Sequence, residues 1–319
     1  MSGSGGVRRV GIISNPLSRM LRKGQGRLGA QAAGLPLAVP ATLAELRTAL
    51  AGFAAQGVDL LAVQGGDGTL REVLTALPAA FGDHPPDIAL LATGKTNLAA
   101  RVLGSAGPGE AALARLLQAA RCGTLRRRLL PVLKVARPGL HGTLPLHGLL
   151  FGAGAFTEAK LLADRALHRR GIHDRLTVLL ALAGVALRTL WGRDASLRAG
   201  AAMELAPDDL APRDGHRFLV LATPLDQLML GLWPFWGDGP GPVRWLDVAA
   251  PPQRLAAALW ASVQGRPRSW MSAAGYRSGN ADRLAIRLGV PFVLDGEVFE
   301  PGPEGLVLSA PGRVAFVTP

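Results

Sequence analysis

The stretch Leu60–Leu77, LLAVQGGDGTLREVLTAL, decides the fold of this 319-residue chain. An apolar run predicts a buried strand, and residues with helical spacing follow the glycine-rich segment GGDGT, up to Pro78. Glycines let a backbone approach a phosphate closely, and a helix start supplies unpaired N–H donors. An acid here would repel a phosphate, so Asp67 makes chemical sense as part of a Mg²⁺ site. The alternative is a tight turn in which Asp67 and Thr69 only cap the helix.

The same strand, loop and helix pattern occurs on both sides of this stretch. Val7–Ser14 is a short β-branched run that ends at Asn15, and the apolar run at residues 87–92 precedes the loop TGKTN and the helix LAARVLG. Between them, TLAELRTALAGFAAQG predicts a helix with Thr42 as N-cap and Glu45 as its capping-box partner. The alternation predicts a parallel sheet covered by helices, with a ligand site at the carboxyl ends of its strands.

The tripeptide GKT at residues 94–96 ends like a Walker A phosphate loop. That pattern needs a glycine five positions before Gly94, because backbone N–H groups must wrap the phosphates. The chain has Ala89 there, inside an expected strand. The Walker interpretation therefore fails.

The second half of the chain has a different texture. From about Arg126 onward, short apolar runs are broken by Gly, Pro and His, which predicts an antiparallel β-rich domain with a helical insertion at about 158–192. We therefore expect an α/β catalytic domain at 1–128, completed by the C-terminal segment 306–319, and a β-rich domain at 129–305.

Composition limits the class of partner. The net charge of +12 comes mostly from arginine and favours a polyanion, although a GC-rich genome would also enrich arginine. Aromatic residues are only 5% and no nucleic-acid module is recognisable, so an anionic membrane surface is favoured over nucleic acid. The single Cys122 excludes an internal disulfide. Leu176–Leu187, the most apolar stretch, is shorter than the roughly 20 residues of a membrane span, and no signal peptide is recognisable, so we expect a cytoplasmic protein.

GGDGT after a strand, with Asn15-Pro16 after the first strand, resembles the diacylglycerol kinase catalytic family of lipid kinases, whose relatives include sphingosine kinases, NAD kinases and phosphofructokinases. The resemblance implies a Rossmann-like three-layer α/β domain followed by a β-rich sandwich that binds the lipid. It also implies ATP and Mg²⁺ as cofactors. The residues that it implies for nucleotide binding are Asn15, Pro16, Thr42, Gly65, Gly66, Gly68, Thr69, Gly94, Lys95, Thr96 and Asn97.

The third loop departs from the family pattern in two places. TGKTNLAARVLG is similar to a family segment of the GTGND or GTTN type, but Lys95 stands where the family usually has Thr, and Leu98 where many members have Asp. Arg19 likewise occupies a position in the first loop that is often Gly. These differences leave the subfamily open.

FVLDGEVFE, at residues 292–300, puts two carboxylates on a turn after a strand. Phosphoryl transfer to an alcohol needs an acceptor for the hydroxyl proton. The resemblance implies Glu297 as the general base, with Asp295 and Asp67 in supporting catalytic roles. FWGDGPGPVRWLDV similarly implies Asp238 as a Mg²⁺ ligand beside Asp67. The alternatives are a hairpin turn with solvated acids and, for Asp238, a surface turn.

The resemblance implies an ATP- and Mg²⁺-dependent lipid kinase for diacylglycerol or a related lipid, with the nucleotide between the two domains. A soluble-substrate kinase of the NAD kinase type, or a non-catalytic lipid-binding or regulatory protein on the same scaffold, are the alternatives. The arginine-rich insertion predicts peripheral contact with an anionic membrane, unless its helix is buried. A homodimer is a further expectation from relatives that dimerise.

Overall fold

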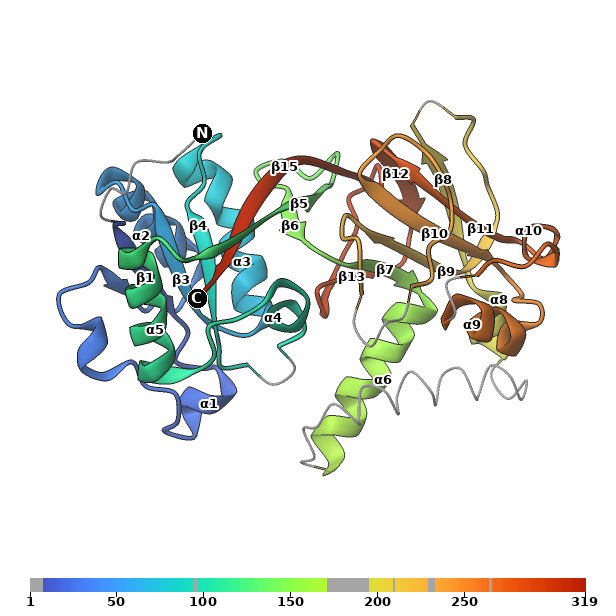
Figure 1. Ribbon diagram of the computed structural model, residues 1–319. Helices are drawn as coiled ribbons and strands as arrows, with labels where there is room; N and C mark the ends of the chain where they lie inside the picture. Colours follow the sequence, from blue (N-terminus) through green and yellow to red (C-terminus); the bar gives the residue numbers. More distant parts are fainter. Residues whose placement is uncertain (1–7, 95–96, 171–194, 209, 229–232, 264–265) are drawn as a thin grey trace. The chain divides into compact units, whose positions relative to one another are not determined.

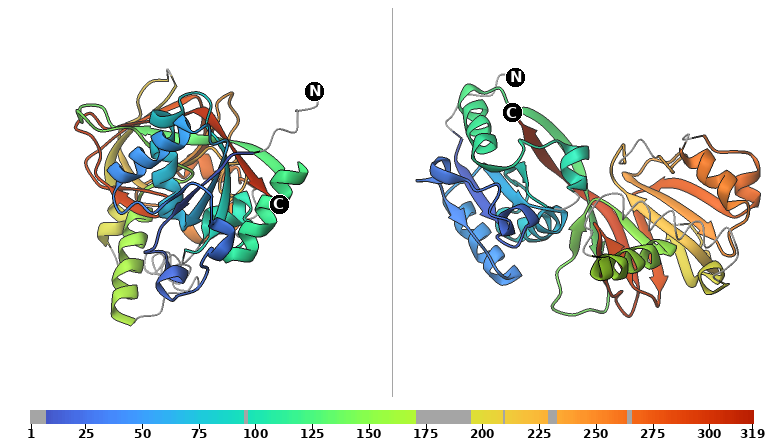
Figure 2. Two further views of the ribbon diagram at one scale, coloured as in Figure 1. Left: turned by 90° about the vertical axis from the view of Figure 1, so that its left-hand side faces the viewer. Right: turned by 90° about the horizontal axis from the view of Figure 1, so that it is seen from below.

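The computed structural model describes residues 8–94, 97–170, 195–208, 210–228, 233–263 and 266–319 (Figure 1). The chain divides into two compact units: a first unit of Met1–Leu130 with Gly312–Pro319, and a second unit of Pro131–Pro311. Two strands, β5 (Arg126–Ala136) and β15 (Leu306–Thr318), run from one unit into the other (Figure 2). The sequence predicted domain boundaries after residues 128 and 305. The first lies inside β5, and the second lies directly before β15.

The first unit contains a parallel sheet, as the alternating pattern predicts. Its strand order is β2-β1-β3-β4-β15, and each neighbouring pair is parallel. The strands that precede β15 are β1 (Val10–Ser14), β2 (Leu37–Ala38), β3 (Leu60–Gly65) and β4 (Asp87–Ala92). The C-terminal end of the chain therefore supplies the strand beside β4 in a sheet built by its beginning, and β15 also pairs with β5.

Helices cover both faces of this sheet and make three layers. Successive side chains of a strand point to opposite faces. Ile12 packs with Leu113 and Leu116 of α5 (Gly109–Cys122), whereas a Cβ added at Gly11 would lie 3.1 Å from the ring of Phe53. Phe53 belongs to α2 (Leu43–Ala55), and α2 packs on α3 (Asp67–Phe81). Short helices α1 (Arg19–Arg22), η1 (Gly29–Ala32) and α4 (Leu98–Leu103) complete the unit.

The caps of α2 and α3 show where local sequence signals hold and where they do not. The Thr42 hydroxyl accepts from Glu45 N at 3.2 Å, which confirms Thr42 as the N-cap. Glu45 Oε2 accepts from Ala41 N at 2.8 Å, one residue before the Thr42 N–H that a capping box would use. The prediction that the next helix ends before Pro78 is wrong, because α3 continues to Phe81. Pro78 removes one N–H donor, but it lies in the last turn of a helix held by buried Leu74 and Leu77.

The second unit is an antiparallel β structure, as expected. One run of paired strands is β14-β13-β7-β9-β10-β11, and a second is β8-β12-β15, with β5 and β6 paired at the side. One apolar cluster joins the two runs: Phe151 and Phe292 of the first pack with Leu205, Leu284 and Leu308 of the second. The strands not yet given are β6 (Leu146–Gly148), β7 (Phe151–Gly154), β8 (Ala201–Pro207), β9 (His216–Thr223), β10 (Val243–Ala249), β11 (Tyr276–Ala281), β12 (Arg283–Leu288), β13 (Phe292–Leu294) and β14 (Glu297–Phe299).

Helices of the second unit are α6 (Ala155–Arg170), α8 (Ala195–Ala199), α9 (Leu255–Val263) and α10 (Trp270–Ala273). α6 covers the first part of the predicted insertion at 158–192. The rest of that insertion, with the apolar stretch Leu176–Leu187, lies outside the described residues. Among the helices that the structure describes, none has the length and apolar character needed to cross a bilayer.

Candidate functional site

Loops at the carboxyl ends of β1, β3 and β4 converge in the first unit. Asn15, directly after β1, donates its side-chain amide to the Thr69 hydroxyl at 2.9 Å. Its backbone N–H donates to the Gln64 carbonyl, also at 2.9 Å, and its Oδ1 accepts from Leu17 N. The first loop is therefore fixed both to the end of β3 and to the first turn of α3.

The glycines of these loops make room for protein atoms. A Cβ added at Gly65 would lie 2.5 Å from Thr69, and a Cβ added at Gly94 would lie 2.5 Å from the Gly66 Cα. Real Cβ atoms essentially never come this close to a backbone atom. The GGDGT loop and the third loop thus touch backbone to backbone, which side chains at Gly66 and Gly94 would prevent. Besides the close approach to a phosphate that the sequence predicts, these glycines therefore have a second role in packing one loop on the other.

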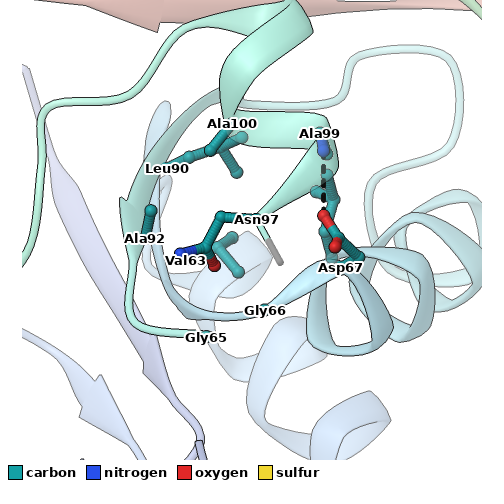
Figure 3. A pocket seen from close by; sticks show the side chains of 10 residues that line it. Val63, Gly65, Gly66, Asp67, Leu90, Ala92, Asn97, Ala99 and Ala100 are labelled. Carbon is teal, nitrogen blue, oxygen red and sulfur yellow. Dashed lines mark hydrogen bonds between the residues drawn. The ribbon is translucent and has the colours of Figure 1, made fainter. Parts of the chain in front are cut away.

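Asp67 connects the same two loops (Figure 3). It is the first residue of α3, yet its Oδ1 accepts a hydrogen bond of 2.8 Å from Ala99 N, in the first turn of α4. Asn97, the N-cap of α4, has left-handed backbone angles and donates its side-chain amide to the Gly94 carbonyl at 3.2 Å. Asp67 therefore caps α4 across the site, where the alternative interpretation from sequence had it cap its own helix.

A small pocket lies between these loops. Its lining includes Gly65, Gly66, Asp67, Asn97 and Ala99 (Figure 3). Its volume of about 10 Å³ corresponds to about one water molecule, so a nucleotide phosphate would not fit inside it. The Asn97 Oδ1 is buried without a hydrogen-bond partner in the described part of the chain. The pocket thus offers an acceptor beside the start of α3.

The start of α3 suits an anion. Its N-cap, Gly66, has no side chain, so no side-chain cap covers the first N–H groups of a 15-residue helix. Those N–H groups and the positive end of the helix dipole attract phosphate. A nucleotide-bound Mg²⁺ takes most ligands from phosphate and water, so one carboxylate of the protein, here Asp67, is sufficient. The residues present therefore fit a nucleotide phosphate with its metal ion.

Within the described part of the chain, the other residues predicted to bind the nucleotide do not line this pocket. Gly68 lies in the first turn of α3. Pro16 and Thr42 are exposed, and the Thr42 hydroxyl caps α2. Lys95 and Thr96 lie outside the described residues.

Sequence reasoning missed the buried polar residues under the loops. Gln64, 1% exposed, accepts from the Ser14 hydroxyl at 2.6 Å and donates to the Gly26 carbonyl at 2.6 Å. Thr93, fully buried, donates its hydroxyl to that of Ser18 at 3.0 Å. Gln64 is the last residue but one of β3 and Thr93 directly follows β4, and a polar residue at the end of an apolar run was the available signal. They hold the segment between β1 and β2 against the ends of β3 and β4.

The DGE segment lies in the second unit and forms a hairpin turn between β13 and β14. Asp295 and Gly296 have φ values of 48° and 83°, the positive signs that a type I′ turn requires. The Asp295 carboxylate accepts from Leu149 N at 3.0 Å and from Leu150 N at 2.9 Å. Thr223 donates its hydroxyl to the Leu149 carbonyl at 2.7 Å. Asp295 is thus a fixed acceptor, where the hairpin alternative had expected solvated acids.

The two remaining predicted acids are exposed. Glu297 begins β14 opposite Leu294, and its side chain faces solvent within the second unit. Asp238 lies in an irregular segment before β10, where its backbone carbonyl accepts from Asn280 N at 3.3 Å. Within the described ranges, no three His, Cys, Asp or Glu side chains gather closely enough to hold a metal ion by themselves.

Two titratable groups with shifted pKa values lie elsewhere in the second unit: the partly buried His147 and the buried Asp247. Burial lowers the pKa of His147 to about 4, and the nearby charge of Lys134 adds to this shift. Burial raises the pKa of Asp247, opposed by Arg217, whose Nε lies 3.0 Å from Asp247 Oδ1. The Arg217–Asp247 pair is almost completely buried and belongs to β9 and β10.

Comparison with known proteins gives one family. Residues 22–123 match the model of the diacylglycerol kinase catalytic domain. That range contains the GGDGT loop and the third loop, whereas Asn15, Asp295 and Glu297 lie outside it. No curated protein matches the chain.

Three solved structures from Bacillus anthracis share the fold over 98% of this chain and 97% of theirs. One is described as a diacylglycerol kinase, with a TM-score of 0.58 and 14% identity. The other two, provisionally described in the same way, have TM-scores of 0.64 and 0.57 at 15% and 16% identity. The resemblance to the diacylglycerol kinase catalytic family is thus confirmed over residues 22–123 by the family model, and the fold of the whole chain by these structures.

Proposed function

We propose that this protein is an ATP- and Mg²⁺-dependent lipid kinase that transfers the γ-phosphoryl group to a hydroxyl of diacylglycerol or a related lipid. One observation carries the proposal. The uncapped start of α3 lies where the loops after β1, β3 and β4 meet, and Asp67 ties it to the third loop. The match to the kinase catalytic domain covers the second and third of these loops.

Residues of the first unit have defined tasks in this proposal. The N–H groups at the start of α3 bind and orient phosphate oxygens, and the bond from Asn15 to Thr69 keeps the first loop beside them. Mg²⁺ would neutralise charge on the transferring phosphoryl group, with Asp67 as its protein ligand. Because phosphoryl transfer depends mostly on positioning and electrostatics, a rigid arrangement of loops is the main requirement.

The second unit supplies the proton acceptor in this proposal. The lipid hydroxyl oxygen attacks the γ-phosphorus, the bond to the β–γ bridging oxygen breaks, and the hydroxyl proton passes to the Glu297 carboxylate. Asp295 is a positioning residue, because its carboxylate is engaged by Leu149 and Leu150 N–H groups. Asp238 remains a proposed metal ligand, supported only by its segment's resemblance.

The test is transfer of radiolabelled γ-phosphate from ATP, with Mg²⁺, to a panel of lipid alcohols in mixed micelles and, separately, to NAD. Glu297→Gln is the test variant. Glu300→Gln is the matched control, because Glu300 is another exposed acid just past β14. We expect a labelled lipid from the parent and the control but not from Glu297→Gln. Label in NAD alone, or in no acceptor while ATP still binds, would contradict the proposal.

A further inference from the structure

Helix α9 of the second unit buries one face in a defined apolar cluster. Leu255, Ala258 and Ala261 are at most 8% exposed, and their spacing places them on one side of the helix. They pack with a cluster that includes Phe235, Met271 and Tyr276. This packing fixes which side of α9 turns outward, and Figure 1 shows α9 at the surface of the second unit, beside α8.

The outward side of α9 is apolar as well. Ala256 and Ala257 are exposed, Leu259 is 42% exposed and Trp260 is 64% exposed. A surface helix ordinarily carries polar or charged side chains on its outer face, and residues 255–261 contain none. Single exposed apolar residues need no explanation, but a helix that is apolar on both sides does. We call Ala256, Ala257, Leu259 and Trp260 the α9 face.

The charged residues that flank α9 along the chain have one sign. Arg254 precedes the helix, and Arg266 and Arg268 follow it, all three exposed. The chain has no Asp or Glu from residue 248 to residue 281. The acid just before that range, Asp247, is buried against Arg217. An exposed Leu–Trp pair is therefore bordered along the chain by arginines alone.

We propose that the α9 face is a docking surface for an anionic lipid membrane. Trp260 and Leu259 enter the boundary between headgroups and acyl chains, where tryptophan is favoured, and Arg254, Arg266 and Arg268 contact headgroup phosphates. The positive border argues against a second copy of this chain, because two such faces would repel each other. The proposal stands on α9 and its border, and it holds whether or not the protein proves to be a kinase.

Vesicle binding tests the proposal on the full-length protein. The probes are phosphatidylcholine vesicles with or without phosphatidylglycerol, and binding is measured by co-flotation. For Leu259→Ala with Trp260→Ala we expect the partition coefficient on anionic vesicles to fall about tenfold or more, because most of the inserted apolar area is lost. Leu210→Ala is the matched control. Leu210 is 58% exposed in the same unit, but it lies close in sequence to an acid, Asp208, and not between arginines. It should bind like the parent.

A second pair of variants separates local charge from net charge. Arg266→Glu with Arg268→Glu should lower binding to anionic vesicles about tenfold or more and leave the weak binding to phosphatidylcholine unchanged. Arg47→Glu with Arg121→Glu makes the same change in net charge on exposed positions of α2 and α5. A similar loss in both variants would overturn the proposal, because net charge and not the border of α9 would then carry binding.

Insertion of Trp260 has its own readout. Trp260→Leu keeps an apolar side chain but removes a fluorophore, so brominated lipids should quench a smaller share of the emission than in the parent, at equal vesicle occupancy. Unchanged quenching would overturn the proposal. Two other results would also overturn the proposal: no vesicle binding by the parent, and parent-like binding by Leu259→Ala with Trp260→Ala. If the parent were a dimer and that double variant a monomer that still binds vesicles, the occupant of the α9 face would be a second copy of the chain, and the proposal would be wrong.

Discussion

The Asn15 amide and the Thr69 hydroxyl are 54 residues apart in sequence and 2.9 Å apart in space. This hydrogen bond joins the loop after β1 to the first turn of α3. Neither residue makes the site alone, because the start of α3 becomes a cradle only when the first loop is held beside it. Buried Gln64 also holds the segment after β1 in place, because it forms hydrogen bonds with Ser14 and Gly26.

Thr69→Val tests this bond. The change keeps the shape of the side chain but leaves the Asn15 amide without its acceptor, so we expect a loss of roughly 1 kcal/mol in unfolding free energy and weaker ATP binding. Urea unfolding and calorimetric titration with ATP measure the two effects. Thr48→Val, at an exposed position of α2, is the control and should leave ATP binding unchanged. Parent-like ATP affinity in Thr69→Val would show that the bond does not shape the site.

Gly94→Ala tests the contact between the GGDGT loop and the third loop. The added Cβ would lie 2.5 Å from the Gly66 Cα, so one loop must move, at a cost of roughly 1–3 kcal/mol. We expect lower stability and loss of ATP binding. Gly52→Ala is the control, since nothing lies within 4 Å of its Cβ and alanine favours a helix by about 0.5–1 kcal/mol. That control should raise the unfolding midpoint, and equal destabilisation by both changes would refute the proposed contact.

Asp67 has a structural and a proposed chemical role that two substitutions separate. Asp67→Asn keeps an acceptor for Ala99 N but removes the charge, whereas Asp67→Ala removes both. We expect Asp67→Ala to lose roughly 1 kcal/mol of stability, as for a lost helix cap, and Asp67→Asn to lose less. Both should lose phosphoryl transfer if the charge assists Mg²⁺. Full activity in Asp67→Asn would exclude that role.

Asp295 should tolerate Asn far better than Ala. Asn-Gly suits a type I′ turn and keeps an acceptor, whereas Ala disfavours a φ of 48° and leaves the Leu149 and Leu150 N–H groups without their partner. We expect Asp295→Ala to lose roughly 2–3 kcal/mol and Asp295→Asn clearly less, measured by urea unfolding. Equal losses would mean that these bonds contribute little.

The lowered pKa of His147 predicts that the folded protein loses stability in acid. Its pKa is lowered to about 4 in the folded protein, so as pH falls below 6.5 the unfolded chain takes up a proton before the folded one does. The contribution is therefore complete above pH 6.5 and declines towards pH 4, by up to about 3 kcal/mol. His147→Gln should flatten this part of the stability profile relative to the parent. Parallel profiles would contradict the burial of a neutral imidazole.

Sequence signals predicted local structure well where one short segment contains all of the interacting parts. The N-cap bond between Thr42 and Glu45 lies within one turn, and the parallel arrangement of strands follows from alternation along the chain. Pro78 shows the limit of such rules. As a local signal it ends a helix, but burial of Leu74 and Leu77 keeps α3 intact to Phe81.

In the candidate site, too, local features followed from the sequence and long-range contacts did not. GGDGT by itself determined that a strand leads through glycines to a helix start suited to phosphate, because backbone geometry and spacing are local properties. Only the tertiary structure decided that Asp67 caps α4, that Gly66 needs a glycine at position 94, that Asn15 reaches Thr69 and that Asp295 holds Leu149. Each of these contacts joins residues distant in sequence. The order of residues along a chain fixes which groups are present, but only the packing of its strands brings distant groups within hydrogen-bond range.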